Sequence, residues 1–229
     1  MNDGLVSHPG PVLLVGGGKS DPDQLRELLD TCALRVAADG GAETLLALGV
    51  MPDAVIGDLD SLTHVSRARI PAERVHHIPE QNSTDFDKCL SNITAPLVYG
   101  TGFLGPRVDH QLAGLTVLAN RPDRRCILLG EEDVIALAPP EIELSLPVAT
   151  RLSLYPLAAM RGESEGLRWP LDGIEFAPAR RVGTSNETSE TRVRLRFDAP
   201  AMLIILPVEA TPALSRGLLS APATWPAHA

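Results

Sequence analysis

The chain has 229 residues, of which 44% are hydrophobic and 21% charged, a composition typical of a soluble globular protein with one large or two smaller domains. Its formal net charge of −9 argues against a generic nucleic-acid-binding surface or an anionic-membrane surface. The three cysteines form no CxxC pair, and the N-terminus shows neither a signal peptide nor a membrane span. We therefore expect a cytoplasmic protein with free thiols.

The first part of the chain alternates short apolar runs with helix-like segments. Strands are predicted at residues 11–15, 34–39, 53–58, 73–79, 96–100 and 125–130, and helices at residues 23–30, 42–49, 84–93 and 110–120. Continuous apolar strands that alternate with helices indicate a parallel sheet covered on both faces. Residues 8–138 are therefore predicted to form an N-terminal, Rossmann-like α/β domain.

The pattern changes near Pro139, where the helical spacing ends. Short segments with a period of two follow at residues 141–147, 150–156, 191–198 and 201–207, separated by prolines and glycines. This period is typical of antiparallel strands. We expect residues 139–221 to form a second, all-β domain, and the tail 221–229 to be loosely ordered.

A glycine-rich turn at residues 16–18 follows the first predicted strand. It is not a P-loop, because Leu13 stands where that motif needs its first glycine. It also lacks the GxGxxG spacing, which argues against a dinucleotide-dependent oxidoreductase. The backbone N–H groups of such a turn can approach a phosphate, but the sequence suits a plain tight turn equally well.

Aspartates recur where predicted strands end or the next helix begins, at Asp39, Asp58, Asp60, Asp85 and Asp109. In open α/β sheets the carboxyl ends of the strands form the ligand crevice. If Asp58 and Asp60 are extended, their Cα atoms lie about 6.6 Å apart on one face, which suits a shared hard cation such as Mg²⁺. Singly, Asp58 also suits a turn, Asp60 a helix cap and Asp85 a helix dipole. Their convergence on one crevice favours the cation.

Basic side chains accompany these aspartates. Lys88 lies one helical turn beyond Asp85, and Arg107 follows the glycine-bearing loop 100–105. A guanidinium at this position can clamp a phosphate, although it also suits an ordinary surface charge. The histidines show no zinc-ligand spacing.

Five segments form an ordered series of motifs from Asp39 to Glu187. AADGGAETLLALGVMPDAVIGDLDSL contains DGGA and then GDxDS, QNSTDFDKCL contains Gln-x-x-Thr-Asp, and GFLGPRVDHQLAGL contains G-x-x-G-x-R-x-D-H. In the second half, EGLRWPLDG contains Gly-Leu-Arg-Trp, and RRVGTSNET contains Gly-x-Ser-Asn-Glu. In this order the segments resemble the thiamine pyrophosphokinase (thiamine diphosphokinase) family.

The resemblance implies a fold and a reaction. The fold is an α/β domain that binds ATP, followed by an antiparallel β-sandwich domain that binds thiamine. The reaction transfers a diphosphate group from ATP to the hydroxyl of thiamine, giving thiamine diphosphate and AMP. The resemblance also implies Mg²⁺ and a homodimer with thiamine sites at its interface, with no nucleic-acid or membrane partner.

By motif, the resemblance assigns Mg²⁺ binding and catalysis to Asp58, Asp60 and Asp85. It places Asp39, Arg107 and Asp109 at ATP or its metal, and Gly40, Gly41, Lys88 and His110 at ATP. It places Gln81, Thr84, Trp169, Ser185 and Asn186 at thiamine. Trp169 has a structural alternative, because a tryptophan in a β domain commonly packs in the core; an aromatic face would also suit the thiazolium cation.

Two positions depart from the family pattern. Pro106 precedes the arginine of the third motif where glycine is common, which removes a backbone N–H. Thr188 follows Ser-Asn-Glu where an aromatic residue is frequent. Two other functions stay open: diphosphate transfer to another hydroxymethyl heterocycle such as a pterin, and non-catalytic sensing of a nucleotide or thiamine. The retained aspartates disfavour a sensor, which has less need of a metal cluster.

Overall fold

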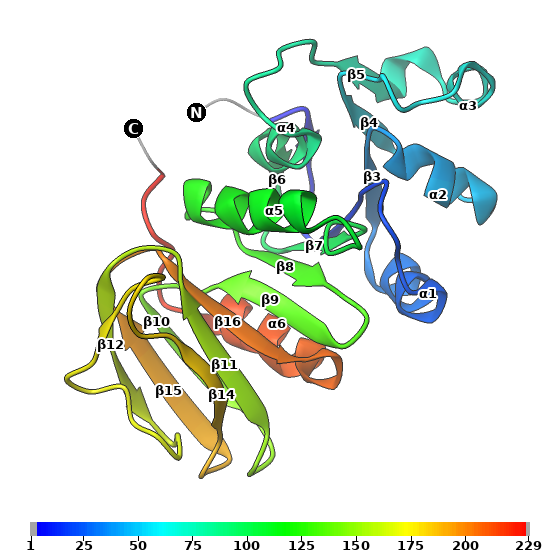
Figure 1. Ribbon diagram of the computed structural model, residues 1–229. Helices are drawn as coiled ribbons and strands as arrows, with labels where there is room; N and C mark the ends of the chain where they lie inside the picture. The colour runs from blue at the N-terminus through cyan, green and yellow to red at the C-terminus, as the bar shows by residue number, and fades with distance from the viewer. Residues whose placement is uncertain (1–3, 228–229) are drawn as a thin grey trace. The chain divides into compact units, whose positions relative to one another are not determined.

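The computed structural model describes residues 4–227 and divides the chain into two compact units (Figure 1). The first unit runs to Val117 and includes Leu128–Gly130, and the second comprises Leu118–Ile127 and the residues from Glu131 onward. None of the described helices is long and apolar enough to cross a membrane.

The first unit contains a parallel sheet. Its strands pair in the order β7 (Val98–Thr101), β2 (Val12–Val15), β3 (Leu34–Ala38), β4 (Ala54–Gly57) and β5 (Val75–His77). All residues of β2, β4 and β7 are buried, as expected for strands covered on both faces. A short parallel pair, β1 (Val6–Ser7) with β6 (Ile93–Thr94), lies outside this sheet. The predicted α/β class is confirmed.

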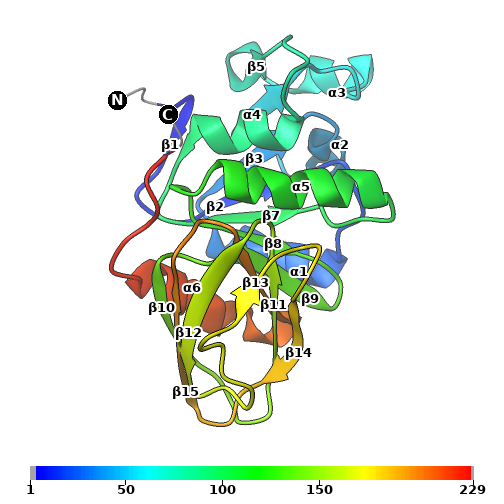
Figure 2. The same cartoon turned by 60° about the vertical axis from the view of Figure 1, so that its left-hand side comes forward.

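Helices cover both faces of this sheet. They are α1 (Pro22–Thr31), α2 (Gly41–Ala47), α3 (His64–Arg69), α4 (Asp85–Asn92) and α5 (Val108–Asn120), with the 3₁₀ turn η1 (Ala72–Arg74) before β5. In Figures 1 and 2, α1 and α2 lie on one face, and α4 and α5 on the other. Side chains of Asp21, Thr63 and Thr84 accept backbone hydrogen bonds at the N-termini of α1, α3 and α4, which fixes where these helices begin.

The second unit is built mainly of antiparallel strands. Strands β10 (Glu141–Ser145), β15 (Arg192–Phe197), β12 (Met160–Glu165) and β13 (Glu175–Phe176) pair in that order. A second set pairs in the order β14 (Gly183–Glu187), β11 (Arg151–Pro156), β16 (Met202–Pro207) and β9 (Asp133–Leu137). The preceding strand, β8 (Cys126–Leu129), spans the division between the units. The predicted antiparallel domain is confirmed.

The second unit also contains a helix that the sequence pattern did not predict. After η2 (Val208–Ala210), α6 (Thr211–Ser220) packs on β10, with Leu214 and Leu218 buried. Gly217 permits this approach, because a Cβ there would lie 2.6 Å from Leu144. The domain is therefore not purely β. In the tail, Trp225 Nε1 donates to the Ala138 carbonyl at 2.8 Å, so the expectation of loose order is wrong for this residue.

Candidate active site

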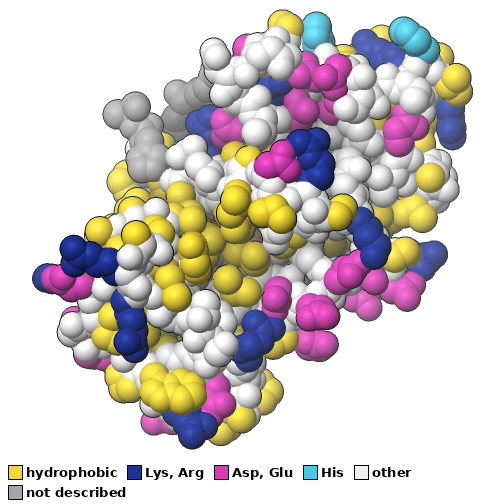
Figure 3. Space-filling model, viewed as in Figure 1, with side chains coloured by type: hydrophobic (Ala, Val, Ile, Leu, Met, Phe, Trp, Pro, Cys, Tyr) yellow, Lys and Arg dark blue, Asp and Glu magenta, His cyan; other side chains and the backbone are white. Residues whose placement is uncertain are grey.

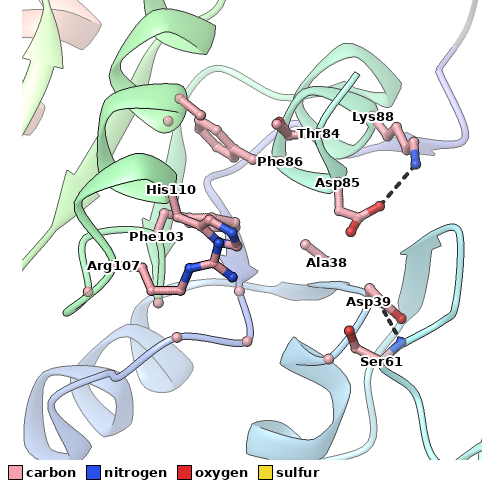
Figure 4. Close-up of a pocket in the computed structure, with 18 of the residues that line it drawn as sticks. Ala38, Asp39, Ser61, Thr84, Asp85, Phe86, Lys88, Phe103, Arg107 and His110 are labelled. Carbon is pink, nitrogen blue, oxygen red and sulfur yellow. Dashed lines mark hydrogen bonds and ion pairs between the residues drawn. The ribbon is translucent and has the colours of Figure 1, made fainter. Parts of the chain in front are cut away.

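A cavity of about 870 Å³ opens in the first unit at the carboxyl ends of the parallel strands (Figure 4). Its lining comes from the segments that follow β2, β3, β4, β5 and β7. From β2 the chain proceeds to β3 on one side, whereas β7 pairs on the other side of β2. Strand order thus reverses beside β2, and open α/β sheets bind their ligands at such a switch point.

Two glycine loops line one wall of this cavity. Gly18 N–H donates to the Gly102 carbonyl at 3.0 Å, and Gly16 N–H donates to the Thr101 carbonyl at 2.8 Å. A Cβ at Gly18 would lie 2.5 Å from the Gly102 oxygen, and Gly102 itself has φ +78°. The glycines are therefore needed for close backbone contact. The turn at residues 16–18, for which the sequence left two interpretations, lines the cavity.

Two carboxylates that line the cavity, Asp39 and Asp58, form a cluster with that of Asp60. One ligand oxygen from each of Asp39, Asp58 and Asp60 lies within 4.8 Å of the others. The extended arrangement considered for Asp58 and Asp60 is not the one found, because β4 ends at Gly57 and Leu59 has φ +65°. The turn, rather than the alternation of a strand, brings the two side chains into one cluster.

Asp39 is the buried member of this cluster, with 3% of its surface exposed. Its Oδ2 accepts from Ser61 N–H at 3.0 Å, whereas the buried Oδ1 has no hydrogen-bond partner. Burial raises the pKa of this carboxyl, and the Ser61 hydrogen bonds oppose that rise. A buried carboxylate oxygen without a partner is costly, and a bound cation would satisfy it.

Asp58 is held by two neighbours. Its Oδ2 accepts from Gln81 Nε2 at 2.9 Å and lies 3.6 Å from Lys88 Nζ. The Gln81 hydrogen bond is the largest influence that lowers the pKa of Asp58, and the Lys88 charge adds to it. The neighbouring Asp60 is exposed, and its Oδ1 accepts from the Ser61 hydroxyl at 2.9 Å. Asp58 is thus a charged carboxylate in a fixed position.

Lys88 lies behind the cluster, with only 2% of its side chain exposed. Its ammonium is 3.2 Å from Asp85 Oδ1, and the same oxygen accepts from Asp58 N–H at 3.3 Å. Burial acts to lower the pKa of Lys88, but the Asp85 hydrogen bond and the charges of Asp85 and Asp58 outweigh it, and the pKa rises. Lys88 is thus a buried counter-ion of these carboxylates.

The predicted and observed carboxylate sets differ in one member. The resemblance assigned Mg²⁺ to Asp58, Asp60 and Asp85, with Asp39 at the nucleotide or its metal. The observed cluster of three contains Asp39 in place of Asp85. Asp85 stands beside it, at the first position of α4, and lines the cavity. The role of Asp85 as a ligand remains a prediction.

Basic and aromatic side chains also line the cavity. Arg107 and His110 point into the cavity in Figure 4, and the Phe86 and Phe103 ring centroids lie 4.5 Å apart. Arg107 pairs with Asp109 at 2.6 Å, and its hydrogen bond lowers the pKa of that carboxyl. Both side chains are exposed, so the guanidinium can exchange partners.

Several lining residues were not predicted from the sequence, among them Glu43, Ser61, Phe86 and Phe103. Ser61 completes the GDxDS motif, and that motif was the available signal for it. The predicted residues Gly40, Gln81 and Thr84 do line the cavity. Gly41 lies at the start of α2, where a Cβ would lie 1.9 Å from the Val15 oxygen, so its role there is close packing.

A smaller pocket of about 260 Å³ lies in the second unit. Its lining includes Trp169, Arg181, Ser185 and Asn186, together with apolar side chains. Trp169 is 52% exposed, which excludes the alternative of a core tryptophan. Asn186, in contrast, is 5% exposed. The motif residues predicted to meet thiamine from this half of the chain therefore lie at one pocket.

The surface charges are mixed in sign. On the face shown in Figure 3, basic and acidic side chains lie next to one another. In the second unit, for example, Arg192 pairs with Glu143 at 2.6 Å and Arg194 pairs with Glu141 at 3.6 Å. Such exposed pairs contribute little to stability.

Two family models match the chain. Residues 25–128 match "Thiamin pyrophosphokinase, catalytic domain", and residues 141–202 match "Thiamin pyrophosphokinase, vitamin B1 binding domain". The first match contains the carboxylate cluster, and the second contains the small pocket.

Individual proteins show the same similarity. The chain is 28% identical over 206 residues to thiamine pyrophosphokinase 1 of Oryza sativa, with 75% of this chain and 78% of the relative covered. It is 27% identical over 207 residues to thiamine pyrophosphokinase of Bacillus subtilis, covering 85% and 96%. The crystal structure of the Bacillus subtilis enzyme superimposes with a TM-score of 0.72 at 25% identity, covering 86% of this chain and 98% of that one.

Proposed function

This chain belongs to the thiamine pyrophosphokinase family, and from this membership we propose how its two units carry out the reaction. It is a diphosphotransferase that makes thiamine diphosphate from thiamine and ATP. Matches to both a catalytic and a vitamin B1 binding model disfavour a pterin substrate and a non-catalytic sensor.

The finer organisation is part of the proposal. We propose that residues 8–138 form a Rossmann-like, ATP-binding domain and that residues 139–221 form a β-sandwich, thiamine-binding domain. The two family matches, at residues 25–128 and 141–202, fall inside these ranges and support them. We also propose a cytoplasmic location, supported by the three buried, free cysteines. Recovery of the protein outside the cytoplasm on cell fractionation would contradict this location.

The observation that carries the proposed mechanism is the unpartnered, buried Oδ1 of Asp39 beside Asp58 and Asp60. A cluster of three carboxylates that includes such an oxygen fits a hard divalent cation, and Mg²⁺ commonly binds proteins through carboxylates together with substrate phosphates. We propose that Asp39, Asp58 and Asp60 hold Mg²⁺, with Asp85 beside them. A bound Mg²⁺ supplies neutralisation of the phosphate oxygens in the transition state.

The chain's own residues place the reactants. Within the glycine turn, the Gly17 N–H is placed to bind a phosphate oxygen, because the N–H groups of Gly16 and Gly18 donate to the Thr101 and Gly102 carbonyls. The Arg107 guanidinium binds a further phosphate oxygen and exchanges Asp109 for the nucleotide. Lys88 keeps Asp58 and Asp85 charged and in place. The thiamine hydroxyl oxygen attacks the β-phosphorus, the bond from this phosphorus to the α-phosphate oxygen breaks, and AMP leaves. The hydroxyl proton passes to a nearby carboxylate or to water, with Asp85 placed to orient the hydroxyl.

The substrate assignment is tested by measuring AMP release from ATP and Mg²⁺ with thiamine, with a hydroxymethylpterin, or with no acceptor. We expect AMP to accumulate only with thiamine, in equal amount to thiamine diphosphate. Faster release with the pterin would assign the chain to the alternative substrate, and no acceptor-dependent release at all would favour the sensor.

We predict that thiamine binding depends on Trp169. Its exposed indole offers an aromatic face, and loss of that contact in Trp169→Ala should cost about 0.5–2 kcal/mol of thiamine binding, a roughly two- to thirty-fold rise in KM. The KM for ATP and the melting temperature should change little, because a core tryptophan would instead cost about 3–5 kcal/mol of stability. The control Trp225→Phe should leave the thiamine KM unchanged. A large fall in melting temperature with an unchanged KM would make Trp169 structural.

We further propose a homodimer in which a second subunit completes the thiamine site. At about 260 Å³, the pocket beside Trp169 is smaller than the usual ligand pocket of roughly 300–1,000 Å³. Dilution into the range where dimers dissociate should therefore reduce the activity per chain. Light scattering under assay conditions provides the comparison, and a fully active, monodisperse monomer would contradict the shared site.

A further inference from the structure

The Trp169 backbone is bound on both sides by one buried side chain. Asn186 Oδ1 accepts from Trp169 N–H at 3.2 Å, and Asn186 Nδ2 donates to the Trp169 carbonyl at 2.7 Å. The same Oδ1 also accepts from Glu187 N–H at 2.8 Å. The Asn186 carboxamide thus pairs with both the N–H and the C=O of Trp169, as a neighbouring β-strand would, and this fixes the position of the Trp169 backbone. These hydrogen bonds of Asn186 are thus made to backbone groups of Trp169 and Glu187.

The Trp169 ring has a second contact, made by the adjacent residue Arg168, which β14 holds through Glu187. The Arg168 guanidinium carbon lies 4.8 Å from the indole centroid. Arg168 Nη1 is 2.5 Å from Glu187 Oε1, and Arg168 N–H donates to the Glu187 carbonyl at 2.9 Å. Glu187 therefore fixes both the backbone and the head group of the residue that stacks on the indole. It also neutralises the guanidinium, so that the pair adds no net charge next to a cationic substrate.

The geometry points to Arg168, Asn186 and Glu187 as positioning residues that hold the Trp169 indole ready for the thiamine ring. Trp169 lines the small pocket and Arg168 does not, so the guanidinium supports the ring from outside the pocket. Without these contacts the exposed indole would be mobile, and part of the free energy of thiamine binding would be spent on ordering its side chain. This inference rests on the proposed function, and it gives Asn186 a role through Trp169 in place of the direct thiamine contact predicted from the sequence.

The test changes the exposed ion pair of Arg168 and Glu187, because neither substitution alters the buried core. In a Trp225→Phe background, where Trp169 is the sole tryptophan, we compare Arg168→Met, Glu187→Gln and the double variant. Loss of the stacked guanidinium should lower the fluorescence anisotropy of Trp169 and raise the thiamine KM about two- to five-fold. The kcat and the ATP KM should stay unchanged. The double variant should be no worse than Arg168→Met alone, because the two residues act as one unit.

Arg161→Met is the matched control, because Arg161 also pairs with a glutamate, Glu175, on the surface of the same unit. It should change neither the fluorescence anisotropy of Trp169 nor the thiamine KM. Asn186→Asp, which keeps one acceptor and removes the donor to the Trp169 carbonyl, should raise the thiamine KM in the same way provided that circular dichroism shows a folded protein.

Two results would overturn the proposal. One is an unchanged anisotropy and thiamine KM in both Arg168→Met and Glu187→Gln. The other is a lower anisotropy with an unchanged KM, which would mean that the ordered ring does not serve thiamine. Thiamine diphosphate formation by the parent Trp225→Phe protein, measured in the same assay, separates either result from a failure of the proposed reaction.

Discussion

Asn in place of Asp58 or Asp60 is expected to lower turnover by orders of magnitude while the protein still folds. The amide keeps the shape of the side chain and its capacity to accept hydrogen bonds, including the Gln81 bond at 2.9 Å from Asp58. It removes the charge that the phosphate-binding cation needs. Steady-state kinetics and thermal melting of each variant give the two readings.

The controls for this prediction come from the same chain. Asp23→Asn alters a carboxylate whose side chain is 91% exposed and far in sequence from the cluster, and it should keep full activity. Asp39→Asn should lose activity as severely as Asp58→Asn, because Asp39 supplies the buried oxygen of the cluster. Activity within a few-fold of wild type in both Asp58→Asn and Asp60→Asn would contradict a catalytic cation at this cluster.

Replacement of Lys88 with Met is expected to destabilise the first unit. The ammonium is buried and lies 3.2 Å from Asp85 and 3.6 Å from Asp58. Its removal leaves neighbouring carboxylates without a counter-ion, but those carboxylates are partly exposed and water offsets part of the repulsion. We expect a loss of about 1–3 kcal/mol in the free energy of unfolding, less than for a fully buried pair.

The effect of added Mg²⁺ distinguishes loss of a counter-ion at the carboxylate cluster from a general loss of stability in Lys88→Met. A cation at the cluster replaces the charge of the lost ammonium. The difference in the free energy of unfolding between wild type and Lys88→Met should therefore shrink as Mg²⁺ is added. Arg26→Met is the control, because its pair with Asp23 is exposed and should contribute little with or without Mg²⁺. Chemical denaturation with and without Mg²⁺ provides the measurement. Equal stability of Lys88→Met and wild type without Mg²⁺ would rule out the counter-ion role.

The position of the site could be predicted because the loops after parallel strands all emerge at one edge of the sheet. The residues after the strands at 34–39 and 53–58 meet at the cavity for this reason, although they are far apart from Gly102 and Arg107 in the chain. The apolar runs also identified the α/β class. These features depend on periodicity and chain order, which the sequence displays directly.

Side-chain partners could not be predicted in the same way. The positive φ of Leu59 redirects Asp60, and the sequence offers no signal for it at a non-glycine residue. Asn186 belongs to a motif, yet its carboxamide binds the Trp169 backbone across the unit. Helix α6 was missed because Pro212 and Gly217 weaken its helical signal, although Pro suits the first turn and Gly217 packs against Leu144.

In the proposed reaction, one diphosphate group moves intact from ATP to thiamine. The most direct measurement uses ATP labelled with radioactive phosphorus at the β position, incubated with thiamine, Mg²⁺ and the purified protein. We predict that the label appears in thiamine diphosphate and that the AMP formed is unlabelled. Labelled ADP together with thiamine monophosphate would show attack at the γ-phosphorus and contradict transfer of the intact diphosphate.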